Sequence, residues 1–148
     1  MYKSIWFVRI QTIAFLYNKF ILPKANKFQH PVPVLTYQVY VVELSKRVFT
    51  ENFKFRSANP QFNGVLECLY VGMSSKTPQE RLKQHKSGYI NKKGHKLSAY
   101  IVQNYGRCLR PSLYDHINSK RMNRQEALIA EEKLAWDLRR AGYAVWFN

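Results

Sequence analysis

The sequence predicts an α+β domain, because strand-type segments and helix start signals occur together in one short chain. Residues 36–44 (TYQVYVVEL) and 67–72 (ECLYVG) are rich in β-branched and aromatic residues, which favour strands. Two later segments each begin with a helix-capping pattern and end at a glycine. The chain has 148 residues, 46% of them hydrophobic, which predicts one ordered domain with a real core.

Residues 1–35 form an apolar and basic extension that differs from the rest of the chain. Charged and polar residues interrupt its apolar run, so no stretch of about 18 apolar residues is available for an obligate membrane span. No clean secretory signal is present, and no acidic residue occurs before Glu43. We expect a peripheral helix or an appended extension, with organelle targeting or membrane-surface attachment as the alternatives. Prolines in 30–34 (HPVPV) break any helix, so the second domain is predicted at 36–148.

The first predicted strand, 36–44, is followed by an excursion over 45–66 that contains Ser, Asn, Pro and Gly with scattered aromatic residues. The second strand, 67–72, ends at a glycine. A third candidate strand is 108–117 (CLRPSLYDHI). Because Pro111 cannot donate a hydrogen bond to a ladder, we expect this strand at a sheet edge.

The first predicted helix begins at Thr77 with the pattern Thr-Pro-Gln-Glu and stops at Gly88. This pattern is a capping box with proline at the first helical position. Arg81 and His85 lie four residues apart on this helix and therefore share a face.

The second predicted helix begins at Asn123 and ends at Gly142. Its apolar stripe at helical spacing consists of Ala127, Ala130, Leu134, Leu138 and Ala141. Glu131 lies in the middle of this stripe. A carboxylate there is costly unless it pairs with a cation or binds a metal. The two alternatives are a buried salt bridge, with Arg81 as the candidate partner, and a functional carboxylate.

The charge balance favours a polyanionic partner. The chain has 24 Lys and Arg against 9 Asp and Glu, a net charge of +15. Nucleic acid is the first candidate partner and an anionic membrane surface the second. Within 76–96, seven basic residues stand against one acid, and we expect six of them to follow a nucleic-acid backbone without reading its sequence. These are Lys76, Lys83, Lys86, Lys92, Lys93 and Lys96. A solvated loop is the alternative.

Cysteine and histidine usage points to neither a disulfide framework nor a zinc site. The two cysteines, Cys68 and Cys108, are predicted to be reduced packing thiols, and the four histidines lack a metal-ligand spacing. We therefore expect an intracellular location, in the cytoplasm or nucleoid.

Taken in order, the motifs resemble the GIY-YIG nuclease superfamily over about residues 36–145. The two tyrosine motifs stand as Gln38-Val39-Tyr40 and Tyr70-Val71-Gly72, and the helices carry RLKQH and EALIAEEKL. The chain departs from the family pattern at Gln38, where the namesake glycine would stand. Twenty-nine residues separate the two motifs, more than the family commonly uses, and Asn148 is the only late candidate for its asparagine.

The resemblance implies a metal-dependent nuclease with a small three-stranded antiparallel sheet flanked by helices. Carried over by position, Glu131 would hold one divalent ion, Mg²⁺ or Mn²⁺. Tyr40 would activate or deprotonate the attacking water, and Tyr70 would orient that water or a phosphate oxygen. Arg81 would neutralise the developing phosphate charge, and His85 would assist in proton transfer or hold the phosphate. Phosphodiester hydrolysis builds negative charge on oxygen, which a metal ion and a guanidinium stabilise.

The expected function is therefore a DNA endonuclease, with RNA left open as a substrate. We expect no large target-recognition domain after the second helix, which favours a structure-guided or loosely specific enzyme. Specificity would otherwise come from a protein partner or a homodimer. The alternative is a non-catalytic nucleic-acid-binding module on the same fold. A missing catalytic Glu or Arg would favour that alternative, and neither is missing.

Overall fold

The computed structural model describes residues 35–95 and 98–147. Residues 1–34, Lys96 and Asn148 lie outside these ranges. The predictions made for them, including those for nearly all of the N-terminal extension, therefore fall outside the described residues. In the described part, no helix is both long enough and apolar enough to cross a membrane.

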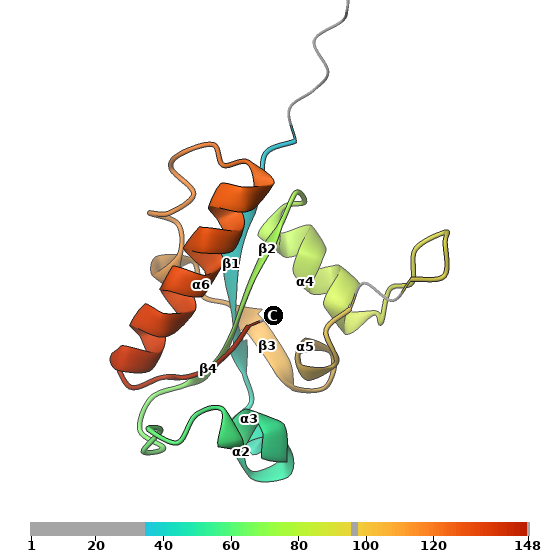
Figure 1. The fold of residues 1–148 in the computed structure, drawn as a ribbon. Helices are drawn as coiled ribbons and strands as arrows, with labels where there is room; N and C mark the ends of the chain where they lie inside the picture. Colours follow the sequence, from blue (N-terminus) through green and yellow to red (C-terminus); the bar gives the residue numbers. More distant parts are fainter. Residues whose placement is uncertain (1–34, 96–97, 148) are drawn as a thin grey trace, which may run out of the picture. The chain divides into compact units, whose positions relative to one another are not determined.

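Four strands form one mixed sheet in the order β3-β1-β2-β4 (Figure 1). Strand β1 (Gln38–Leu44) pairs antiparallel with β2 (Cys68–Ser74) on one side and with β3 (Gly106–Leu109) on the other. Strand β4 (Ala144–Trp146) pairs parallel with β2. The predicted α+β class is confirmed, but the predicted three-stranded antiparallel sheet is wrong. Strand β4 has only three residues, too few for a sequence pattern, and it reaches β2 because the preceding helix returns the chain to that edge.

The third predicted strand lies at a sheet edge, as expected, but its bounds differ. Residues 108–117 were expected to be extended, whereas β3 ends at Leu109 and a 3₁₀ helix, η1 (Pro111–Leu113), follows. Proline lacks an N–H donor and has a fixed φ, so it ends the ladder and begins the short helix.

The two capped helices form where the sequence predicts them. Helix α4 (Pro78–Lys86) begins after Thr77, whose side chain accepts from the Glu80 N–H while the Glu80 carboxylate accepts from the Thr77 N–H. Helix α6 (Arg124–Arg140) begins with the same reciprocal pair between Asn123 and Glu126. Each cap satisfies backbone donors that a helix start leaves without partners, so both start points are set locally.

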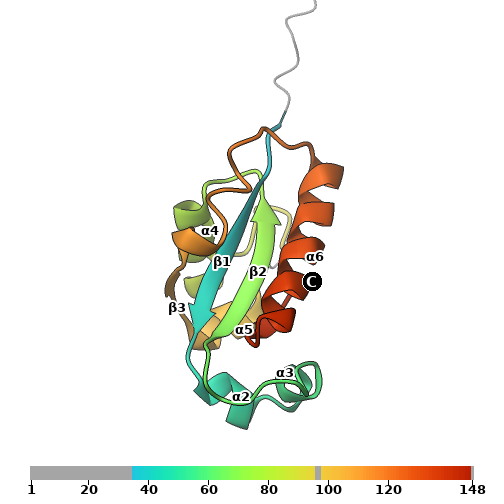
Figure 2. The same cartoon turned by 90° about the vertical axis from the view of Figure 1, so that its left-hand side faces the viewer.

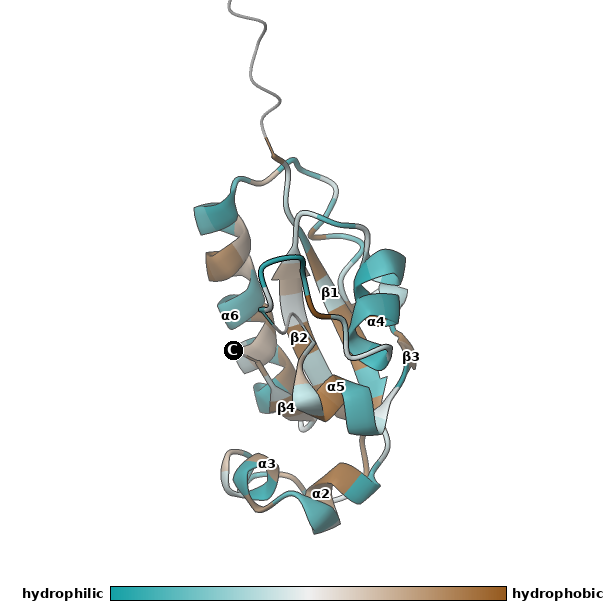
Figure 3. Cartoon of the chain, turned by 90° about the vertical axis from the view of Figure 1, so that its right-hand side faces the viewer, coloured by the Kyte–Doolittle hydropathy of each residue, from teal (hydrophilic) through white to brown (hydrophobic). Residues whose placement is uncertain are grey.

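The strands β1 and β2 lie between α4 and α6 (Figures 1 and 2). A further helix, α5 (Tyr100–Tyr105), packs beside α4. Because helices cover the sheet, β1 and β2 are buried on both faces, and Val39, Tyr40, Val71 and their neighbours have almost no exposed surface. Figure 3 shows that residues on the outer side of α4 are mostly hydrophilic, in contrast to the apolar strands.

The excursion over 45–66 is helical in part. It contains two short helices, α2 (Arg47–Glu51) and α3 (Phe53–Ser57), at one end of the sheet (Figure 2). Asn59, which is fully buried, fastens this excursion to the core. Its side-chain oxygen accepts from the Val145 N–H at 2.7 Å, and its side-chain nitrogen donates to the Phe55 carbonyl at 2.8 Å.

Replacing Asn59 with alanine should lower the free energy of unfolding by roughly 1–3 kcal/mol, because buried polar groups on β4 and α3 would lose their partners. Urea unfolding of the two proteins measures this difference. Asn104 on α5 is exposed and makes one local bond, to the Tyr100 carbonyl. Asn104→Ala is therefore the matched control and should change the unfolding energy far less. Equal stability of Asn59→Ala and wild type would contradict the anchoring role.

Candidate active site

The candidate site is built on a close contact between Tyr40 and Gly72, which lie opposite each other across β1 and β2. A Cβ added at Gly72 would lie 2.6 Å from the Tyr40 hydroxyl oxygen and 2.8 Å from Cε1 of Tyr70. Gly72 is in an extended strand and is not among the glycines with positive φ. This glycine therefore makes room for two tyrosine rings and does not form a turn.

Tyr40 is hydrogen-bonded to His85, which α4 carries into the core. The Tyr40 hydroxyl lies 2.8 Å from Nε2 of His85, and Nδ1 of the same ring accepts from the Ala99 N–H at 2.8 Å. The histidine is 0% exposed. The rings of Tyr40, Tyr70 and His85 form a triangle, with centroids 5.6 to 6.1 Å apart.

These two hydrogen bonds determine which nitrogen of His85 carries the hydrogen. Burial, reinforced by the positive charge of Arg81, lowers the pKa of His85 to about 4, so the ring is neutral at pH 7. A backbone N–H can only donate, so Nδ1 is the acceptor and Nε2 carries the hydrogen. The Nε2–H group therefore donates to the Tyr40 oxygen, and the Tyr40 O–H remains able to donate elsewhere.

Arg81 lies one helical turn before His85 and is held by its own helix. Its Nη1 donates to the side-chain oxygen of Gln84 at 3.1 Å. Gln84 was not predicted as a site residue, although its position three residues after Arg81 on the same helix was the available signal. No sequence pattern could have predicted the hydrogen bond from Ala99 to His85, because the Ala99 N–H reaches the histidine from a separate segment.

Glu131 is 5% exposed and lies on the inner face of α6, as its helical phase predicted. The buried residues of this helix are Ala127, Glu131, Leu134, Ala135 and Leu138. The negative charge of Glu131 acts on both site tyrosines and raises their pKa values. The structure thus brings Tyr40, Tyr70, Arg81, His85 and Glu131 together, from four different elements.

Burial is the largest influence on both phenols. It raises the pKa of Tyr40, against the charge and hydrogen bonding of Arg81, which lower it. The pKa of Tyr70 lies well above its ordinary value, because burial and the neighbouring Tyr40 and Glu131 all raise it. Both phenols are therefore protonated at neutral pH.

The chemistry of this donor set fits a magnesium ion held partly by a substrate. Among residues 35–95 and 98–147, no group of three or more His, Cys, Asp or Glu side chains could hold a metal ion alone. Magnesium is commonly bound through one or two carboxylates, with water and substrate phosphates completing the octahedron. Glu131 is the one buried carboxylate of the described core, so it is the residue that would hold the ion.

Five of the six lysines predicted to follow a nucleic-acid backbone lie in the described part of the chain, and all five are exposed. Lys92 and Lys93 lie in a loop that extends away from α4 and α5 (Figure 1). The Asn91 side chain shapes this loop by accepting from the N–H groups of Lys93 and His95. Lys86 differs from the others, because its ammonium donates to the Arg107 carbonyl at 2.9 Å and ties α4 to β3.

No protein-family model matches the chain, and the comparisons with curated proteins and with solved structures also found no match.

Replacing Gly72 with alanine should destabilise the fold by about 1–3 kcal/mol, because the added methyl group would overlap Tyr40 and Tyr70. Chemical denaturation measures this change. The exposed Ser75, just beyond β2, provides a matched control, and Ser75→Ala should leave the unfolding energy nearly unchanged. A Gly72→Ala variant as stable as wild type would show that the tyrosines can move aside.

The pH dependence of stability should contain a contribution from His85. The unfolded chain takes up a proton near the ordinary histidine pKa of about 6.5, whereas the folded chain does so only near pH 4. The free energy of unfolding should therefore fall as the pH is lowered from about 6.5 to about 4. Its slope should be at most about 1.4 kcal/mol per pH unit for this one group.

Urea titrations of wild type and His85→Gln across this pH range give the measurement. The difference between the two proteins isolates His85, because the other titrating groups are common to both. Parallel pH profiles would contradict a buried neutral histidine.

Proposed function

We propose that the protein is a metal-dependent endonuclease that hydrolyses phosphodiester bonds in DNA, of the GIY-YIG type. One observation supports this proposal most. Two tyrosines and a neutral histidine pack into one buried cluster, and the charges of Arg81 and Glu131 act on both phenols. A structural core seldom brings together so many ionisable groups. The sequence resemblance assigns the same five residues to catalysis.

In this proposal, Tyr40 handles the attacking water. As a neutral phenol it can orient the water by hydrogen bonding, since its oxygen already accepts from His85. It can take up the water's proton only after its own proton has been lost. The Arg81 charge lowers the pKa of Tyr40 and so opposes the effect of burial. The hydrogen bond from the His85 N–H to the Tyr40 oxygen also favours the phenolate.

Arg81 and Glu131 act on the phosphate. The guanidinium of Arg81 would stabilise negative charge that develops on the non-bridging oxygens in the transition state. A divalent ion, when bound, would supply Lewis-acid stabilisation of the same charge. Glu131 is the carboxylate that would hold this ion, and Tyr70 would orient the water or a phosphate oxygen.

His85 acts through Tyr40 and does not hold the phosphate. Both of its ring nitrogens already have partners, and its lowered pKa leaves it without charge at pH 7. It is therefore a positioning residue for the Tyr40 hydroxyl. The exposed lysines near α4 would contact the nucleic-acid backbone, which carries no sequence information.

The second candidate is a non-catalytic nucleic-acid-binding module on the same fold. The raised pKa values of Tyr40 and Tyr70 favour it, because a protonated phenol is no base. The two candidates differ in one outcome, since only the endonuclease cuts DNA in the presence of Mg²⁺.

The test is Glu131→Gln, which keeps the size of the side chain and removes its charge. Cleavage of supercoiled, linear and branched DNA should stop in this variant, while DNA binding persists. Mg²⁺ should raise the melting temperature of wild type and not that of the variant, because binding to the folded state stabilises it. Glu132→Gln is the matched control, since Glu132 is the exposed neighbour on the same helix.

Two outcomes would contradict these assignments. A Glu131→Gln variant that still cuts DNA would end the proposal. A variant that loses about 3–5 kcal/mol of stability with no Mg²⁺ effect on wild type would assign Glu131 to a buried salt bridge.

A further inference from the structure

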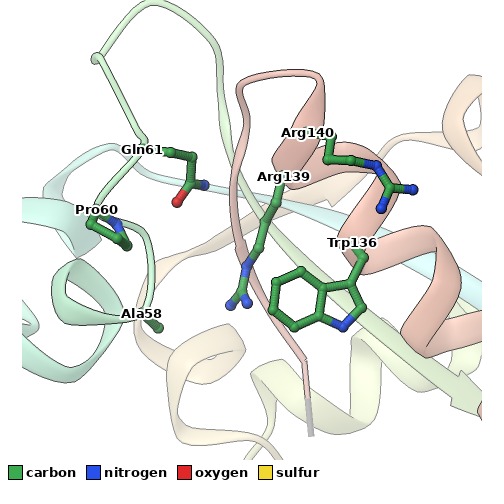
Figure 4. Close-up of a pocket in the computed structure, with 6 residues that line it drawn as sticks. All are labelled: Ala58, Pro60, Gln61, Trp136, Arg139 and Arg140. Carbon is green, nitrogen blue, oxygen red and sulfur yellow. The ribbon is translucent and has the colours of Figure 1, made fainter.

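A pocket of about 510 Å³ lies between the C-terminal part of α6 and the excursion 45–66 (Figure 4). Its lining residues are Ala58, Pro60, Gln61, Trp136, Arg139 and Arg140, and none of them belongs to the proposed catalytic set. The volume lies within the range of sites that bind small molecules or single groups of a larger ligand.

The walls of the pocket are held in place by contacts to β4 and to Tyr143, the residue before it. Asn59 binds the Val145 N–H, and the side-chain nitrogen of Gln61 donates to the Tyr143 carbonyl at 3.1 Å. On the opposite wall, Nη2 of Arg139 donates to the Val145 carbonyl at 2.7 Å. The short segment 143–145 therefore fixes both sides, so the pocket is formed before any ligand binds.

One side of the pocket is an aromatic platform. Trp136 is 46% exposed, and its ring packs edge-on to Phe147 with centroids 6.2 Å apart. The guanidinium carbon of Arg139 lies 4.9 Å from the Trp136 ring centroid and 5.2 Å from that of Phe147. Figure 4 shows Arg139 beside the indole, between α6 and the segment 58–61.

The pocket is also positively charged. Two of its lining residues are arginines and none is acidic. Asp137 is shared by Arg140 and Lys133, whereas Arg139 has no ion pair among the described residues. The Nε–H group of Arg139 is buried and has no hydrogen-bond partner within the described part of the chain. A ligand here should therefore carry negative charge next to a flat apolar group.

We propose that this pocket binds one unpaired nucleotide of a nucleic-acid strand. The base would pack against the exposed part of the Trp136 indole that Arg139 leaves uncovered, and its phosphate would contact Arg139 and Arg140. Aromatic stacking combined with cations is how proteins hold single-stranded nucleic acid, because every base has a flat face. The net charge of +15 favours this occupant over an acidic peptide, since it attracts a polyanion over a longer range.

The position of the pocket on α6 suggests which nucleotide would bind, a step that depends on the proposed function. Glu131 precedes Trp136 by five residues and Arg139 by eight, which corresponds to roughly 8–12 Å along the helix axis. Trp136 lies about 140° around α6 from Glu131, so a strand must also pass around the helix. A nucleic-acid strand advances about 3.4 Å per nucleotide, so the bound nucleotide would lie at least about two to four nucleotides from the cleaved phosphate. The substrate would then be DNA with an unpaired nucleotide near the cut.

The test measures binding in EDTA, so that no cleavage occurs. Fluorescence anisotropy compares a labelled duplex that carries a three-nucleotide bulge with a blunt duplex of equal length. Trp136→Ala should weaken binding of the bulged duplex by roughly tenfold and binding of the blunt duplex by about twofold at most. Trp136→Phe keeps an aromatic ring and should retain most of the affinity.

Ile129→Ala is the matched control, because Ile129 is an apolar residue of the same helix, 60% exposed and outside the pocket. It should leave both affinities unchanged. Melting curves check that each variant is folded. If Trp136→Ala does not fold, Trp136→Phe and Trp136→Leu are compared instead. In that case, the proposal is supported if Trp136→Phe binds the bulged duplex more tightly than the blunt duplex and Trp136→Leu does not.

Three results would overturn the inference. Trp136→Ala could weaken the affinity for both duplexes equally, or leave both affinities unchanged. The third is a pocket saturated by a labelled acidic peptide but not by the bulged duplex. Cleavage in Mg²⁺ is assayed separately. A bulge preference that depends on Trp136 in a protein that never cuts DNA would support the pocket and refute the nuclease. Cleavage of DNA by a protein that shows no such preference would support the nuclease and refute the pocket.

Discussion

The Tyr40 ring lies directly across Gly72 of the neighbouring strand, and the rest of the candidate site depends on this contact. Side chains alternate between the two faces of a strand, so a slip of one residue in the β1–β2 register would turn Tyr40 to the opposite face. It would then lose both Tyr70 and the hydrogen bond to His85. A glycine opposite a tyrosine is therefore a condition for the cluster, and any larger side chain would separate its members.

The site balances burial against charge. Burial keeps the His85 ring neutral and the phenols protonated, whereas Arg81 favours the ionised form of Tyr40. The histidine is locked by the N–H of Ala99, so its remaining hydrogen can only be directed at the Tyr40 oxygen. In the proposed nuclease, such fixed donors and charges would cost nothing to reorganise when the reaction begins, which is the physical basis of electrostatic catalysis.

Helix α6 serves two regions of the protein because its faces differ. Glu131 lies on the buried face beside the tyrosines, and the half-exposed Trp136 lies one and a half turns further on, beside the excursion 45–66. The excursion itself is fastened by the buried side chain of Asn59. A segment that looks like a plain insertion in the sequence therefore forms a wall of a positively charged pocket away from the tyrosine cluster.

Features that depend on neighbouring residues could be predicted from the sequence. Strands β1 and β2 follow from β-branched and aromatic runs, helices α4 and α6 from their capping boxes, and the burial of Glu131 from helical phase. These signals are local, since a cap or a period involves only a few residues. Three features could be seen only once the chain was folded: His85 is buried against Tyr40, Gly72 makes room for the tyrosine rings, and β4 joins the sheet. Each of these depends on segments that are distant in the chain and meet only when the whole core packs.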